Sequence, residues 1–119
     1  MSDIPIDITM QDVESYRPEL TEGRILWVFL NGIVCIASRP WKGHHKIYKY
    51  YCILKGMKLQ DLPKLAWERL NNNLKGMVVC IKTYGLSPNG RLVVTLTKRN
   101  KNINNWVINF AASCTLSCK

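Results

Sequence analysis

An Asn-Gly pair between two apolar runs constrains the fold of this chain more than any other feature. The runs are Ile25–Leu30 and Ile33–Ala37, and Asn31-Gly32 separates them. Asn-Gly adopts the positive φ angles of a two-residue type I′ turn, and β-branched and aromatic residues favour strands. The pattern therefore predicts a β-hairpin. Because nearly every position is apolar, we expect both faces of the hairpin to be covered.

The segment 44–54 follows a loop that contains Pro and Gly, and its centre is rich in strand-forming residues. Alternation would place Ile47, Tyr51 and Ile53 on one face of a strand. A helix stays open as an alternative, because Ile47, Tyr51 and Leu54 also have helical spacing. We favour the strand.

Residues 61–73 have the pattern of an amphipathic helix. Asp61 is a suitable N-cap, Pro63 is tolerated in the first turn, and the run of three Asn residues that begins at Asn71 is expected to end the helix. The apolar stripe of this helix consists of Leu62, Leu65, Ala66 and Leu70, with Trp67 at its edge. We expect the stripe to pack against the sheet.

The last third of the chain reads as three strands, at 77–84, 91–98 and 106–112. Ser87-Pro88-Asn89-Gly90 supplies a turn, and 98–105 is a polar connection. The sequence therefore predicts an α+β fold that is mostly antiparallel β, with element order β-β-β-α-β-β-β. Two three-stranded meanders would flank one central α-helix.

Charge divides the chain of 119 residues into two parts. Residues 1–22 hold six acidic residues against Arg17, a net charge of −5, and residues 23–119 hold 16 Lys and Arg against Asp61 and Glu68, a net of +14. We interpret 1–22 as an acidic, partly disordered arm and 23–119 as a single basic domain. The favoured interpretation of the arm is a solvated tail, and the alternative is an arm that covers the basic body.

A domain this basic is expected to bind something acidic, and nucleic acid is the favoured partner, RNA before DNA. Lys and Arg neutralise phosphates, while flat rings stack on bases. The candidate nucleic-acid-binding residues are Arg39, Trp41, Lys42, His44, His45, Lys46, Lys49, Arg91, Lys98, Arg99 and Lys101. Affinity should then fall steeply with salt.

Two other binding functions remain open. The same charge suits an anionic membrane, as in a matrix-type assembly protein, with Trp41 in a basic loop. The third possibility is a protein-interaction module that pairs through a strand edge. Under all three functions a homodimer is expected to cover exposed sheet. The abundance of Asn, Ile and Lys is typical of A/T-rich genomes, including those of many viruses.

Catalytic and metal chemistry find little support, so we predict a non-enzymatic protein with no cofactor. No nucleotide-binding or hydrolase motif is present, and Asp61 and Glu68 suggest no carboxylate pair. The adjacent His44 and His45 would point to opposite faces of a strand, which opposes shared zinc ligation. The five cysteines are expected to be reduced thiols. Without a signal peptide or a transmembrane segment, we expect the protein in the cytoplasm or nucleus.

Overall fold

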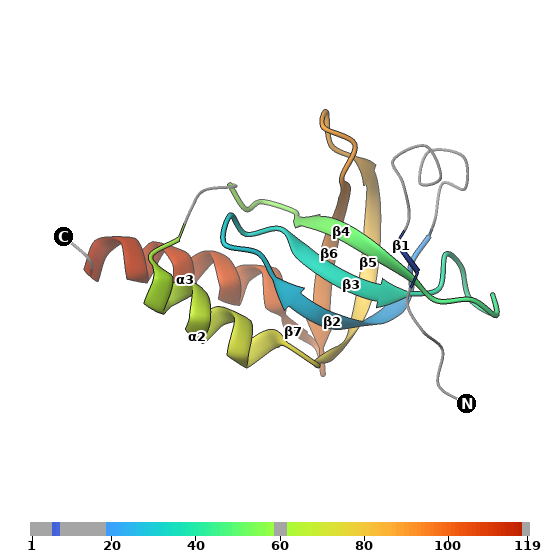
Figure 1. The fold of residues 1–119 in the computed structure, drawn as a ribbon, viewed down its shortest axis with the longest axis horizontal. Helices are drawn as coiled ribbons and strands as arrows, with labels where there is room; N and C mark the ends of the chain where they lie inside the picture. The colour runs from blue at the N-terminus through green and yellow to red at the C-terminus, as the bar shows by residue number, and fades with distance from the viewer. Residues whose placement is uncertain (1–5, 8–18, 59–61, 118–119) are drawn as a thin grey trace.

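The computed structural model describes residues 6–7, 19–58 and 62–117, which form seven strands and two helices (Figure 1). In chain order the elements are β1 Ile6–Asp7, β2 Glu22–Val28, β3 Val34–Ser38, β4 Tyr48–Leu54, α2 Lys64–Leu74, β5 Val78–Leu86, β6 Leu92–Lys98, β7 Lys101–Asn102 and α3 Ile103–Ser117. Asp61, the predicted N-cap of the helix, lies outside the described residues, as does most of the acidic arm.

Five of the strands close into a barrel. β2 pairs with β3, β3 with β4, and β2 with β5, all antiparallel, and β5 pairs antiparallel with β6. These pairings leave β4 and β6 as the edge strands of these five. A parallel pairing between them, in which Cys52 lies opposite Leu92, closes the sheet into a barrel. The predicted fold of two meanders around one central helix was therefore wrong. Local patterns do not reveal a parallel contact between strands that are separated by a helix and another strand.

The barrel interior is filled by alternate residues of each strand. Ile36 of β3, Tyr50 of β4 and Leu96 of β6 are each at most 1% exposed, and they belong to one continuous hydrophobic core. Tyr51 and Ile53 share one face of β4, as the alternation predicted, and that face is the outer one. The register places them out of phase with Tyr50, Cys52 and Leu54.

The hairpin of β2 and β3 is confirmed, but its predicted type I′ turn is wrong. The Phe29 N–H donates to the Ile33 carbonyl, and the Gly32 N–H donates back to the Phe29 carbonyl. Gly32 has a φ of 96°, whereas Asn31 is not in the positive-φ region. The loop thus has three residues with Gly in the left-handed position, and the Asn31 side chain accepts a hydrogen bond from the Ile33 N–H.

Helix α2 covers one end of the barrel, next to the β2–β3 turn (Figure 1). Ala66 and Leu70 are buried as predicted, but Leu65 is 75% exposed. Two polar contacts fix the helix to β2: the Trp67 indole donates to the Val28 carbonyl at 2.7 Å, and the Asn71 side chain accepts from the Val28 N–H at 2.8 Å. Asn71, expected to terminate the helix, therefore holds it in place.

The final strand predicted at 106–112 is instead part of helix α3. Asn102 caps the first turn, because its side chain accepts a hydrogen bond from the Asn105 N–H at 2.9 Å. Val107 and Ala111 are buried four residues apart, as a helix requires. The segment 98–105, predicted as a polar connection, instead holds a tight turn between β6 and β7, in which Arg99 and Asn100 both have positive φ, followed by β7 and the first residues of α3.

Candidate nucleic-acid interface

The outer face of β2, β3 and β4, which crosses in front of β5 and β6 in Figure 1, carries a row of aromatic rings. In the register, Ile25 lies opposite Ile36, and Trp27 lies opposite Cys35, so Leu26 is an extra residue in a β-bulge. The bulge places Leu26 and Trp27 on the outside between the buried Ile25 and Val28.

The outward side chains of three strands meet in one row. Trp27 of β2 lies opposite Cys35 of β3, which lies opposite Tyr51 of β4, and opposite residues of an antiparallel pair share a face. Cys35 is fully buried although it lies outside the core cluster. The two large neighbours in its row account for this burial.

Phe29 joins the two rings of this row. Its ring lies 5.8 Å from the Trp27 ring in an edge-to-face arrangement, and 5.8 Å from the Tyr51 ring in a tilted one, both measured between centroids. All three side chains are half-buried, so each ring keeps solvent-accessible surface. The three rings form one continuous aromatic surface on the outer face of the barrel.

A cation lies at each end of this aromatic surface. The Lys49 ammonium is 5.7 Å from the Trp27 ring centroid, and the Arg91 guanidinium is 5.7 Å from that of Tyr51. Lys49 comes from β4, whereas Arg91 immediately precedes β6. We call the series Lys49, Trp27, Phe29, Tyr51 and Arg91 the aromatic track.

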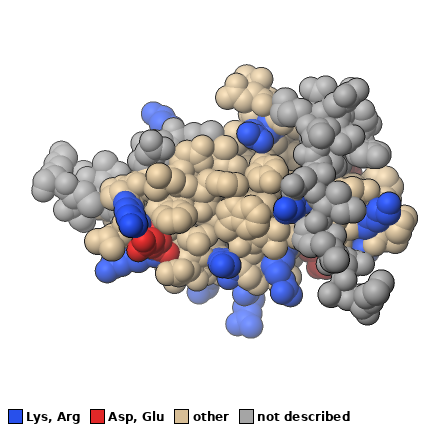
Figure 2. All heavy atoms as spheres, in the orientation of Figure 1, with Lys and Arg blue, Asp and Glu red and all other residues tan. Residues whose placement is uncertain are grey.

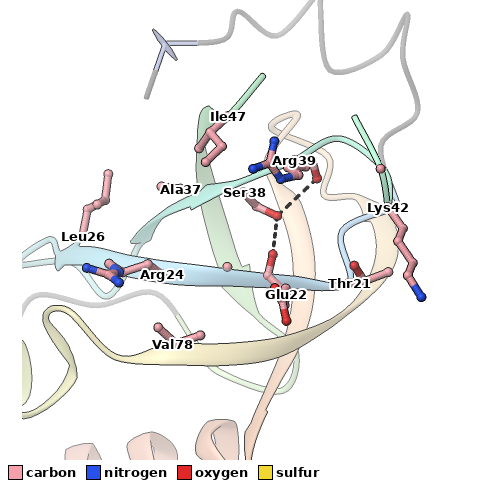
Figure 3. A pocket seen from close by; sticks show the side chains of 12 residues that line it. Thr21, Glu22, Arg24, Leu26, Ala37, Ser38, Arg39, Lys42, Ile47 and Val78 are labelled. Carbon is pink, nitrogen blue, oxygen red and sulfur yellow. Dashed lines mark hydrogen bonds between the residues drawn. The ribbon is translucent and has the colours of Figure 1, made fainter. Parts of the chain in front are cut away.

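A hollow of about 870 Å³ is lined mainly by residues of β2, β3 and the loop that follows β3 (Figure 3). Leu26 of the bulge lines it, and its charged lining residues are Arg24, Arg39, Lys42 and Glu22. Arg24 lies opposite Ala37, which lies opposite Lys49, so the hollow and the track share the same outer face.

The β3–β4 loop brings other predicted residues together. Trp41 and His44 have their ring centroids 4.5 Å apart, edge to face, and His44 stacks on His45 at 4.9 Å. The expectation that these histidines point to opposite faces was wrong, because they lie in a loop before β4. Arg39 holds the loop closed by donating to the His44 carbonyl at 2.6 Å. The exposed Lys42 and Lys46 belong to the same loop.

The predicted site residues thus fall into three groups. Lys49 and Arg91 belong to the aromatic track; residues 39–46 form the β3–β4 loop; Lys98, Arg99 and Lys101 lie apart at the β6–β7 turn. Trp27, Phe29 and Tyr51 were not predicted as site residues. A weak signal for two of them existed, since Trp27 and Phe29 are spaced by two in an otherwise aliphatic strand.

Basic residues do not gather into a single patch on the face seen in Figure 2, where lysines and arginines lie singly around a central neutral surface. Acidic side chains are few: among the residues whose side chains are described, they are Glu19, Glu22 and Glu68. Glu22 belongs to β2 and lines the hollow, whereas Glu19 precedes β2 and Glu68 belongs to α2. The aromatic track, rather than net charge alone, therefore distinguishes this face.

Two of the three cysteines whose side chains are described are buried. Cys35 and Cys52 are buried and form no disulfide, and burial, followed by the neighbouring Cys35, raises the pKa of the Cys52 thiol far above its usual range. Cys80, which belongs to β5, forms no disulfide and is exposed. A buried, protonated thiol is a packing group rather than a reactive one.

A closed five-stranded barrel with a parallel pair between its third and fifth strands, and a helix between its third and fourth, has the architecture of the OB-fold. The chain thus falls into the class of small closed five-stranded β-barrels, and its outer face carries aromatic and cationic side chains. Its sequence matches no known protein-family profile and no curated protein sequence. In the described part of the chain, no helix has both the length and the apolar character needed to cross a membrane.

Proposed function

We propose that this protein binds single-stranded nucleic acid across the outer face of β2, β3 and β4. The rings of Trp27, Phe29 and Tyr51 stack on unpaired bases, and the cations of Lys49 and Arg91 neutralise phosphates at the two ends of the row. The unbroken series of contacts in the aromatic track is the observation that carries this proposal.

The chemistry of the track favours a single strand over a duplex. In a duplex the faces of the bases are stacked on one another, whereas in a single strand they are open to aromatic side chains. OB-type barrels commonly bind oligonucleotides on the face of their second and third strands, which correspond here to β3 and β4. Likeness of fold supports the proposal but does not replace the argument from the rings.

The net charge of +14 on residues 23–119 supplies the rest of the affinity. Each phosphate that a lysine or arginine neutralises releases a counterion, so binding should weaken as salt rises. The preference for RNA over DNA remains a prediction from the sequence, and the binding assay includes both.

The test compares Trp27→Ala with Trp106→Ala in fluorescence anisotropy on labelled 12-nucleotide RNA and DNA strands. Trp106 is a suitable control because it is 42% exposed and lies on α3, outside the track. Loss of one stacked base should weaken binding roughly 5- to 150-fold for Trp27→Ala. Trp106→Ala should leave affinity unchanged, and circular dichroism verifies that both variants are folded.

Three results would overturn the proposal. The first is equal affinity of the two tryptophan variants, and the second is binding that does not change with salt. The third is binding of a duplex as tightly as a single strand. Flotation of the nuclease-treated protein with anionic liposomes, together with no binding to either nucleic acid, would favour the membrane function instead.

A further inference from the structure

A second aromatic and cationic group lies on a different wall of the barrel, around Tyr84 of β5. The Tyr84 side chain is 41% exposed, and the Lys55 ammonium sits 3.9 Å from its ring centroid. The Lys82 ammonium lies 5.4 Å from the same centroid. Two exposed positive charges thus flank one exposed ring, contributed by β5 and by the residue that follows β4.

The ring of Tyr84 is held in a defined orientation. Its phenolic oxygen accepts a hydrogen bond of 3.1 Å from the Thr95 hydroxyl on β6. This hydrogen bond, together with the positive charges of Lys82 and Lys55, lowers the pKa of the Tyr84 phenol. No acidic residue whose side chain is described lies on β4, β5 or β6, so these lysines are not paired with a carboxylate from those strands.

The sheet register connects this group to the aromatic track. Tyr51 of the track and Ile53 project outward from β4, and Lys55 follows two residues later. Ile53 lies opposite Val93, and both are half-buried, so an apolar step separates the two groups. Four residues of β-strand span about 13 Å, which is the length of roughly four stacked nucleotides at about 3.4 Å each.

We infer that Lys55, Tyr84 and Lys82 form a second subsite for the same single strand, which crosses from the aromatic track over Ile53 and Val93 to stack a base on Tyr84. The inference rests on the proposed function. It adds that the protein selects strands long enough to reach both groups, and that very short strands occupy only the track.

Binding measured against strand length tests this inference. Oligouridine strands of 4, 6, 8, 12 and 16 nucleotides are titrated with the wild-type protein, Tyr84→Ala and Tyr84→Phe. For 12 nucleotides we expect Tyr84→Ala to weaken binding roughly 5- to 150-fold, and for 4 nucleotides less than about twofold, because only the longer strand reaches Tyr84. Tyr84→Phe keeps the stacking surface and should remain close to wild type at every length.

A charge variant adds an independent readout. Lys82→Ala should reduce the slope of log affinity against log salt by about one for the 12-nucleotide strand and leave it unchanged for the 4-nucleotide strand. Lys64→Ala is its matched control, because Lys64 is also exposed but belongs to α2.

The outcomes separate the inference from the proposed function. Suppose that Trp27→Ala weakens binding of the strands, but that Tyr84→Ala has no effect or the same effect at every strand length. The second subsite is then wrong, and the proposal for the aromatic track stands. If no strand of any length binds the wild-type protein, the proposed function fails and the subsite fails with it.

Discussion

Replacing Asn104 should destabilise the protein more than its small size suggests. Asn104 lies in the first turn of α3 and is only 2% exposed. Its side-chain oxygen accepts from the Leu96 N–H at 2.9 Å, and its side-chain nitrogen lies 2.9 Å from the Val94 carbonyl and 3.2 Å from the Lys55 carbonyl. One side chain thus ties the C-terminal helix to β6 and to the loop that follows β4.

The magnitude follows from which groups lose their partner in Asn104→Ala. The Val94 carbonyl keeps a hydrogen bond from the Lys55 N–H at 2.8 Å, but the Leu96 N–H becomes a buried donor without an acceptor. An orphaned donor costs about 1–3 kcal/mol, and each lost hydrogen bond about 0.5–1.5 kcal/mol. We expect the free energy of unfolding to fall by about 2–4 kcal/mol, and the Tm by about 10 °C.

Urea denaturation followed by circular dichroism measures this change. Asn109→Ala is the control, because Asn109 is an exposed residue of the same helix. Asn104→Asp adds a second arm: it keeps the acceptor for Leu96 but turns a carboxylate oxygen toward two carbonyls, so it should also destabilise. A loss below about 1 kcal/mol for both variants would refute the bridging role.

Three further predictions follow from the structure. Gly23→Ala should prevent folding or lower the Tm sharply, since its new Cβ would lie 2.7 Å from the Ala37 carbonyl oxygen; a melt within a few degrees of wild type would contradict this. Removal of residues 1–18 deletes four acidic residues and one arginine, which raises the net charge from +9 to +12. We therefore expect tighter nucleic-acid binding at low salt, and an unchanged affinity would contradict this expectation. Because its pKa is lowered, the Tyr84 phenol ionises at a lower pH in the folded protein than in the unfolded chain. Ionisation of Tyr84 therefore raises the free energy of unfolding at pH values above the ordinary tyrosine pKa, and this contribution is lost as the pH falls through the pKa of the folded state. Thr95→Val should move that ionisation upward in an absorbance titration at 295 nm, and an unmoved curve would exclude the hydrogen bond as the main cause.

Local patterns predicted the early strands and the central helix but not how they assemble. The apolar residues on either side of Asn31-Gly32, and those within 61–73, each follow one dominant periodicity. The first could therefore be assigned to strands and the second to a helix. Residues 106–112 fit both a strand and a helix. Trp106, Ile108 and Phe110 alternate as in a strand, while Val107 and Ala111 have the spacing of a helix. The Asn102 cap, a local contact, favours the helix, and the burial of Val107, which depends on tertiary structure, agrees with it.

The candidate site could be predicted only in part, for a similar reason. Lys49 and Arg91 stand out in the sequence because they are charged. Trp27 and Phe29 lie in a run that reads as core, and only the bulge at Leu26 together with the register shows that their side chains face outward. The proximity of Arg91 to Tyr51 depends on closure of the barrel, which no local pattern encodes.

The parallel pair between β4 and β6 has a consequence for how the protein acquires its structure. Cys52 and Leu92 are register partners although forty positions separate them, so their contact cannot form until most of the chain has been synthesised. Contacts of such high sequence separation slow folding and leave strand edges open in the meantime. A nascent chain that has emerged from the ribosome only through β5 is therefore an open sheet, prone to aggregate until β6 arrives.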